Sequence, residues 1–439
     1  MEEQNAKITV LFGPNGSGKT QYVERLRRQM ANSSVRYLAF SDAYGPATDR
    51  AYYLQLRWNQ HDIDEETPCV GSLLDKAYQQ TGEDTPERRQ LREQLYQLFD
   101  MNQLLDKYVI LLSSGELRKF QLIKTLLANP QTLFLDNPFI GLDAEARQQL
   151  NTLLCSLAKH QNIMLYLLLA KSDDIPDYAD EVIRFPQDER EVAIELSNDI
   201  EADFSTLVSE IPHNPAYSSP VVIDMHNVSI RYGERTILSN LSWQVKKGER
   251  WALSGQNGSG KSTLLSLVCA DNPQSYACDI SLFGHQRGSG ESIWEIKRHI
   301  GYVSPEMHRA YMRDLPTVNV VASGLKDTVG LYVRSSAEEK QLCRKWLRLF
   351  GIEHLADRSF ITLSSGEQRL ALVARAFVKN PDLLILDEPF HGLDDHNRQL
   401  VRTLITAYCR QAEKTLVMVT HYENEFPECI NHQLYLKRQ

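Results

Sequence analysis

A five-residue sequence, Leu-Ser-Ser-Gly-Glu, occurs twice in this chain, at residues 112–116 and 363–367. Each copy follows a glycine-rich stretch of the form G-x-x-x-x-G-K-[ST], at residues 13–20 and 255–262. Each copy also precedes an apolar run that ends in an acidic residue. The same three motifs in the same order predict that one chain folds into two related domains.

The distances between the motifs show how closely the two halves correspond. Ser113 and Ser364 lie 251 positions apart, whereas the two glycine-rich stretches lie only 242 apart. The second half therefore carries nine more residues between its glycine-rich stretch and its copy of the repeat. We expect much of this surplus in the turn-rich segment 271–290.

We expect a first domain over residues 1–185 and a second over residues 221–439. Residues 186–220 are acidic at first and then rich in Pro, Ser and Asn, which is typical of a linker with room for one short helix. Apolar runs before the glycines and before the acidic residues predict buried parallel strands, and residues 72–111 and 317–360 look mostly helical. The predicted fold class is α/β, with a mainly parallel sheet and a helical insert in each domain.

Composition excludes several classes of protein. The net charge of −9 gives no indication of a nucleic-acid partner, although a local basic groove would still be compatible with it. The seven dispersed cysteines indicate reduced thiols in a cytosolic protein and no disulfide frame. The acidic start is no secretory signal, and the apolar run at 163–170 is too short to span a bilayer. A role at a membrane would need another polypeptide to supply the membrane part.

The glycine-rich stretches predict phosphate binding. Glycines let backbone N–H groups turn toward phosphate oxygens, the lysine bridges the terminal phosphates, and the hydroxyl that follows it holds Mg²⁺. The residues expected to bind nucleotide in this way are Gly13, Asn15, Gly16, Ser17, Gly18, Lys19 and Thr20 in the first domain, and Gly255, Asn257, Gly258, Ser259, Gly260, Lys261, Ser262 and Thr263 in the second.

Two aspartates complete the predicted metal sites. Asp136 and Asp387 end apolar strands, where a carboxylate can reach a metal ion through water, although a strand-end aspartate can also satisfy backbone donors of the next turn. With the loop hydroxyls they give one Mg²⁺ site in each domain, formed by Thr20 and Asp136 and by Ser262 and Asp387.

The two domains differ in their catalytic residues. Glu388 follows Asp387, where a carboxylate can orient and polarise the water that attacks the γ-phosphate. Asn137 holds that place in the first domain, and an amide cannot accept the proton. His421, which follows the last apolar strand of the second domain, corresponds to Ala170. We therefore expect Glu388, His421 and Lys261 to be catalytic, and the first site to bind ATP but hydrolyse it slowly or not at all.

A third asymmetry concerns the nucleotide base. The second domain has a leader before its loop strand, and Tyr232 in that leader is placed to stack on adenine or to pack within a strand. The first domain begins almost at its loop strand and has no such leader.

Together these motifs resemble those of the ATP-binding cassette (ABC) superfamily, and the resemblance covers nearly the whole chain apart from the linker. Walker A, the signature, Walker B, the D-loop (residues 141–143 and 392–394) and the switch His421 occur in the family's order. The signature reads Ser-Ser-Gly-Glu where most members read Ser-Gly-Gly-Gln. The resemblance implies two tandem P-loop ABC ATPase domains.

The resemblance also implies how the sites are assembled, as a head-to-tail sandwich in which each Walker A faces the other domain's signature across ATP. Site two would combine Gly255 to Thr263, Asp387, Glu388 and His421 with Ser113, Gly115 and Glu116. Site one would combine Gly13 to Thr20, Asp136 and Asn137 with Ser364, Gly366 and Glu367.

One residue of the family pattern is missing. Most members have a Gln after the strand that precedes the helical insert, and it couples the metal site to that insert. Neither half of this chain shows it. Its role would fall to Ser41, Asp42, Ser304 or Glu306.

Two stretches, residues 52–59 and 323–332, are similar to those of the tandem ATPases linked to molybdate transport operons, the photorepair-protein type. The resemblance implies a cytoplasmic ATPase at the inner face of a membrane, whose partners are separate membrane-spanning subunits. The alternatives are a soluble mechanoenzyme acting on the ribosome or nucleic acid, and a regulator or scaffold in which ATP only switches shape.

Overall fold

The computed structural model describes most of the chain. The described residues are 7–30, 34–40, 67–109, 112, 114–139, 142, 144–161, 163–185, 200–211, 217–232, 235–255, 258–305, 307, 311, 314–328, 334–420 and 425–437. They form two compact units: unit one, from the described residues up to 185, and unit two, from those after 199. The domain boundaries expected at 185/186 and 220/221 stay predictions.

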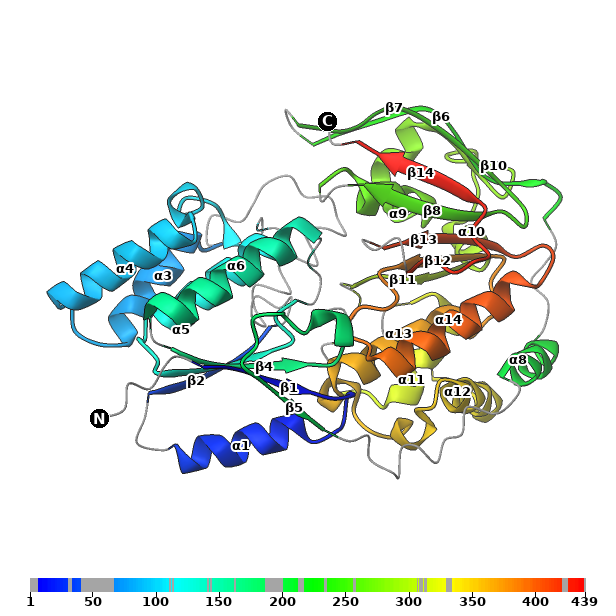
Figure 1. Ribbon diagram of the computed structural model, residues 1–439. Coiled ribbons are helices and arrows are strands. Elements are labelled where there is room, and N and C mark those ends of the chain that lie inside the picture. Colours follow the sequence, from blue (N-terminus) through cyan, green and yellow to red (C-terminus); the bar gives the residue numbers. More distant parts are fainter. Residues whose placement is uncertain are drawn as a thin grey trace. The chain divides into compact units, whose positions relative to one another are not determined.

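Unit one is a parallel sheet with helices on both faces (Figure 1). Its strands run in the order β2-β3-β4-β1-β5, and every neighbouring pair is parallel. Both faces of such a sheet are covered, so its central strands are continuous apolar runs. The elements are β1 (Ile8–Phe12), α1 (Lys19–Gln29), β2 (Val35–Ala39), α3 (Val70–Gln80), α4 (Pro86–Leu98), α5 (Ser114–Leu126), β3 (Thr132–Asp136), α6 (Ala144–Gln161), β4 (Met164–Leu169) and β5 (Glu181–Arg184), with short 3₁₀ turns at Met101–Gln103 and Ser172–Asp174.

Unit two repeats this sheet and adds a second one. The parallel strands run in the order β11-β12-β13-β8-β14, and an antiparallel sheet runs β10-β9-β6-β7. The elements are α8 (Ile200–Ser209), β6 (Val221–Tyr232), β7 (Arg235–Lys246), β8 (Arg250–Gly255), α9 (Lys261–Val268), β9 (Asp279–Leu282), β10 (His285–Gln286), α10 (Ile293–Lys297), β11 (Ile300–Val303), α11 (Thr317–Ala322), α12 (Ala337–Leu349), α13 (Ser365–Phe377), β12 (Leu383–Asp387), α14 (Asp395–Cys409), β13 (Thr415–Val419) and β14 (His432–Leu436), with 3₁₀ turns at Pro273–Ala277, Ser323–Lys326, Glu353–Leu355 and Phe360–Thr362.

The shared strand order confirms the predicted α/β fold with two parallel sheets. The glycine-rich loops lead from β1 to α1 and from β8 to α9, and these helices begin at Lys19 and Lys261. Residues 271–290, where we expected the surplus of the second half, contain β9 and β10 of the antiparallel sheet. None of the described helices has the length and apolar character needed to cross a membrane.

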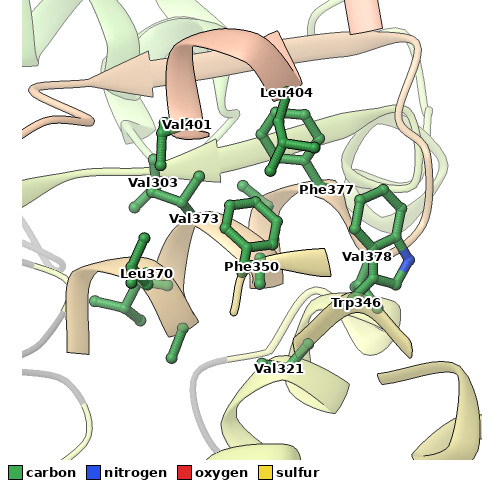
Figure 2. Packing of buried hydrophobic residues seen from close by; sticks show 14 of the residues in the cluster. Val303, Val321, Trp346, Phe350, Leu370, Val373, Phe377, Val378, Val401 and Leu404 are labelled. Carbon is green, nitrogen blue, oxygen red and sulfur yellow. The ribbon is translucent and has the colours of Figure 1, made fainter. Parts of the chain in front are cut away.

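Helix α8 lies within the segment that we expected to be a linker, and it packs on unit two. Its Phe204 is 1% exposed and meets the rings of Trp346 and Phe377 edge-on, with centroids 5.7 and 6.3 Å away. Figure 2 shows Trp346 of α12 and Phe377 of α13 within the core that these helices form with α11 and α14. At least this part of the segment therefore belongs to the hydrophobic core of unit two.

Candidate functional site

The two glycine-rich loops have the backbone shape that an anion site requires. Gly18 and Gly260 precede the first residue of α1 and α9 with φ of 84° and 93°, a left-handed conformation that other residues adopt at a cost. At Gly255 an added Cβ would lie 2.4 Å from the Leu436 carbonyl oxygen, so no side chain fits there. Each loop thus leads into the N-terminus of a helix, where backbone N–H groups attract phosphate.

The loop lysines lie inside these loops. The ammonium of Lys19 donates to the carbonyl oxygens of Gly13 and Pro14 at 2.5 and 2.6 Å. Lys261 makes the matching bond to the Gly255 carbonyl oxygen at 2.6 Å. Both units therefore hold a lysine ammonium inside the glycine-rich loop, and its role in nucleotide binding stays a prediction.

The predicted metal-site aspartates lie at the carboxyl ends of β3 and β12. Burial raises the pKa of Asp136, while a bond from Tyr37 and the charge of Lys19 oppose that rise. Lys19 is therefore close enough to Asp136 to affect its ionisation, so the fold brings loop and strand end together. Asp387 is 8% exposed at the equivalent place in unit two.

Asn137 and Glu388 share one backbone geometry. Their φ angles are 49° and 51°, and their N–H groups donate to Leu168 and Val419 on the neighbouring strand, both at 2.9 Å. Their side chains differ in what they do. The Asn137 amide donates to Asp136 Oδ1 at 3.0 Å, a bond that a carboxylate cannot donate.

Glu388 lies in a buried, acidic environment. Burial is the main cause that raises the pKa of Glu388 well above its usual value, and the charges of Asp387 and Glu425 add to it. Lys261 and Arg369 act in the opposite direction. Glu388 therefore lies within the electrostatic reach of the loop lysine, as a residue acting at the terminal phosphate must.

The left-handed backbone at Glu388 leads to a stability prediction. A Glu in this conformation is strained by about 1 kcal/mol, whereas Asn adopts it readily, as Asn137 does in unit one. We expect Glu388→Asn to raise the Tm of unit two by about 2–4 °C. Calorimetry of the full chain measures this change. The control is Glu388→Gln, which keeps the strain but, like Asn, removes the buried carboxyl beside Asp387 and Glu425. The strain is therefore measured by the difference between the two variants, and Glu388→Asn should melt about 2–4 °C above Glu388→Gln. If both variants melt alike, strain at this position is not the cause.

Tyr232, the predicted adenine platform, is half-buried in β6. Its hydroxyl accepts a bond from the Asn272 amide at 3.0 Å, and the same amide donates to Ser266 Oγ of α9 at 3.2 Å. The bonds tie the end of β6 to the helix that follows the glycine loop. Stacking of Tyr232 on adenine stays a prediction.

The signature motif of unit two forms a capping box. Ser364 Oγ accepts from the Glu367 N–H at 3.3 Å, and Glu367 Oε2 accepts from the Ser364 N–H at 2.7 Å. This explains the Glu in the signature, and the pattern Ser-x-x-Glu before an apolar run was the signal that could have revealed it. Gly366 is buried in the first turn of α13. In unit one Gly115 lies at the start of α5, and Glu116 bonds the Lys107 ammonium at 2.8 Å.

Two buried arginines of α13 were missed from the sequence. Arg369 donates to the Ser304 carbonyl oxygen at 3.0 Å, and Arg375 donates to the Tyr302 carbonyl oxygen at 3.4 Å. Arg375 thus holds the strand β11 itself, and Arg369 holds the residue directly after it, where the family's Gln is missing. Their sequence signal was weak because arginines in a helix usually face solvent.

Several predicted residues lie outside the described residues: Ser113, Asn257, His421, Ser41, Asp42, Glu306, residues 52–59 and residues 329–332. Next to His421, Thr420 and Glu425 are 4% and 3% exposed and are bonded to each other. Glu425 also accepts from Arg398 of α14 at 2.6 Å. The ends of the segment that carries His421 are thus anchored.

Comparison with known proteins gives one consistent result. The model of the family described as "ABC transporter" matches residues 1–140 and 238–391. The chain is 38% identical to the ABC transporter ATP-binding protein ModF of Escherichia coli, over 96% of this chain and 89% of that one. It is 28% identical to an uncharacterized ABC transporter ATP-binding protein of Schizosaccharomyces pombe, over 97% and 91%. A solved model of ribosome-bound archaeal Pelota and ABCE1 shares the fold, with a TM-score of 0.58 at 18% identity over 95% of this chain and 70% of that one.

Proposed function

This chain belongs to the ABC transporter family of ATP-binding proteins, and we propose that it hydrolyses ATP in unit two and binds it without efficient hydrolysis in unit one. We further propose that it is the ATPase component of a transport system and works in the cytoplasm, at the inner face of a membrane. The family membership, and the E. coli relative named an ABC transporter ATP-binding protein, support the transport role.

One observation carries the difference between the sites. Glu388 and Asn137 have nearly the same φ and donate to equivalent strand residues, Val419 and Leu168, so they present different side chains at equivalent positions of the two units. Only the carboxylate can accept a proton from an attacking water. The amide of Asn137 donates to Asp136 instead. This arrangement supports a site that binds ATP without hydrolysing it efficiently.

The roles in unit two follow from chemistry and position. Lys261 and the loop N–H groups would hold the phosphates, and Glu388 would orient the water and accept its proton. Ser262 and Asp387 offer hydroxyl and carboxylate oxygens, the donors Mg²⁺ takes beside phosphate and water. When bound, Mg²⁺ would neutralise phosphate charge. A contribution of His421 and head-to-tail pairing of the units stay predictions.

Tyr232 provides a test of base binding. We expect Tyr232→Ala to weaken ATP binding by unit two about three- to tenfold, because it removes a ring that would stack on adenine. Equilibrium binding of ATP to the Lys19→Ala protein measures this. Tyr232→Phe keeps the ring, loses the bond to Asn272, and should bind as the parent does. Unchanged affinity in Tyr232→Ala would remove the stacking role.

The transport role is tested by its partners. The Glu388→Gln protein, tagged and purified from its host with ATP, should hold a closed state long enough to retain partners. Lys261→Ala/Glu388→Gln, which weakens nucleotide binding, is the control. Recovery of an integral membrane subunit with the single variant alone would support transport. Recovery of ribosomes or nucleic acid, with nothing from the membrane, would refute it and favour the mechanoenzyme.

A further inference from the structure

Tyr37 of unit one reaches the predicted metal site from the neighbouring strand. It lies opposite Phe134 in the parallel register of β2 and β3, so its side chain extends toward the carboxyl end of β3. Its hydroxyl donates to Asp136 Oδ2 at 2.6 Å, across 99 positions of sequence. This is a short hydrogen bond to a half-buried carboxyl group, and it links two strands at the place where a metal ligand was predicted.

The second predicted ligand lies close to the same phenol. Thr20 lowers the pKa of Tyr37, against the larger rise that burial causes. Thr20 and Asp136 are the two unit-one residues predicted to hold Mg²⁺, and the Tyr37 hydroxyl donates to the second of them. The remaining oxygen of Asp136 accepts from the Asn137 amide at 3.0 Å. Both carboxyl oxygens of Asp136 therefore accept bonds from protein groups.

Packing holds the ring of Tyr37 in place. It lies against the small cluster of Leu11, Val23, Phe134 and Leu168 on the α1 side of the sheet. The Arg27 guanidinium lies 5.7 Å from its centroid. For Mg²⁺ to use Asp136, directly or through a water, the metal or that water would have to compete for a carboxyl oxygen that already accepts from the phenol or from the Asn137 amide.

We propose that the Tyr37 hydroxyl takes the place of Mg²⁺ in unit one, so that this unit binds a metal-free nucleoside triphosphate. The inference rests on the proposed nucleotide binding of unit one. Lys19 and the loop N–H groups supply the positive potential that neutralises the phosphates. A site without a catalytic carboxylate has no need of a metal to activate the bond that would break.

The direct test counts bound metal, with Mn²⁺ as the probe read by electron paramagnetic resonance in saturating ATP. The Glu388→Gln protein, which is expected to consume ATP at least about 100-fold more slowly, should bind about one Mn²⁺ per chain. With Tyr37→Phe added, it should bind about two, because the Asp136 oxygen that accepts from Tyr37 is released. Two ions before the change, or one after it, would overturn the proposal.

A second measurement uses the Lys261→Ala background, in which ATP binds mainly to unit one. Dialysis should give a Kd that differs less than about threefold between Mg²⁺ and EDTA, whereas with Tyr37→Phe it should become at least about tenfold tighter in Mg²⁺. Tyr166→Phe is the matched control, because Tyr166 packs in the same cluster and stacks on Phe134 at 4.6 Å. It should behave as the parent does.

The outcomes separate this inference from the proposed function. Equal metal dependence in the parent and in Tyr37→Phe would overturn the role of Tyr37, while the proposed hydrolysis by unit two would stand. Absence of ATP from unit one would overturn both this inference and the proposed role of that unit. Persistent turnover in Glu388→Gln would contradict the proposed function alone.

Discussion

Glu388→Gln should lower the rate of ATP hydrolysis at least about 100-fold while ATP binding is retained. Glutamine has the shape of glutamate and can adopt the same strained backbone, but it cannot accept a proton from water. Only unit two carries a carboxylate at this position, so no other group would take over. Phosphate release at saturating ATP measures the rate, and equilibrium binding shows that the site is intact.

The matched control is Asn137→Ala, at the equivalent position of unit one. It removes the amide that bonds Asp136 and should change turnover less than about twofold, since unit one contributes little hydrolysis. An equal loss in both variants would show that the two sites act alike, and the asymmetric assignment would then be wrong.

Lys261→Ala should reduce turnover about 100-fold, because the ammonium makes charge-assisted bonds to the phosphates that the loop alone cannot replace. Lys19→Ala should reduce turnover less than about threefold at saturating ATP, because unit one only binds nucleotide. Steady-state kinetics of the two variants measure the difference.

The two lysines form a closely matched pair. Each follows a left-handed glycine and donates to the carbonyl of its loop's first glycine. Loss of either bond should therefore affect folding alike, and thermal melts of both variants check this. Equal losses of turnover with equal melts would mean that unit one also hydrolyses ATP.

Much of the fold followed from short patterns along the chain. Apolar runs before glycines and before aspartates predicted strands that the structure places in two sheets of the same order. Continuous apolar runs are typical of strands that are covered on both faces of a sheet. The spacing of the glycines indicates a loop whose backbone must turn sharply. The positions of Glu388 and Asn137 followed from a constant offset, and their shared backbone geometry agrees with it.

The candidate site could be predicted only in part. The loops, lysines and aspartates are local motifs, and the structure brings each lysine near the acidic end of a central strand. The roles of Tyr232, His421 and the signature serines depend on nucleotide and on pairing of the units, so they stay predictions. The capping box at Ser364 could have been predicted from the pattern Ser-x-x-Glu, but this motif was interpreted only as a nucleotide-binding signature.

The sequence by itself determined that the chain holds two related units, which residues form their glycine loops, and which unit carries the carboxylate. Only the tertiary structure decided that Tyr37 bonds Asp136, that Arg369 holds Ser304, and that α8 joins the core of unit two. The features that the sequence determined depend on residues that are close together along the chain, because local spacing decides where strands and turns form. The features that only the tertiary structure decided join residues that lie 99 and 65 positions apart, or on separate helices, and such contacts exist only once the sheets place their elements side by side.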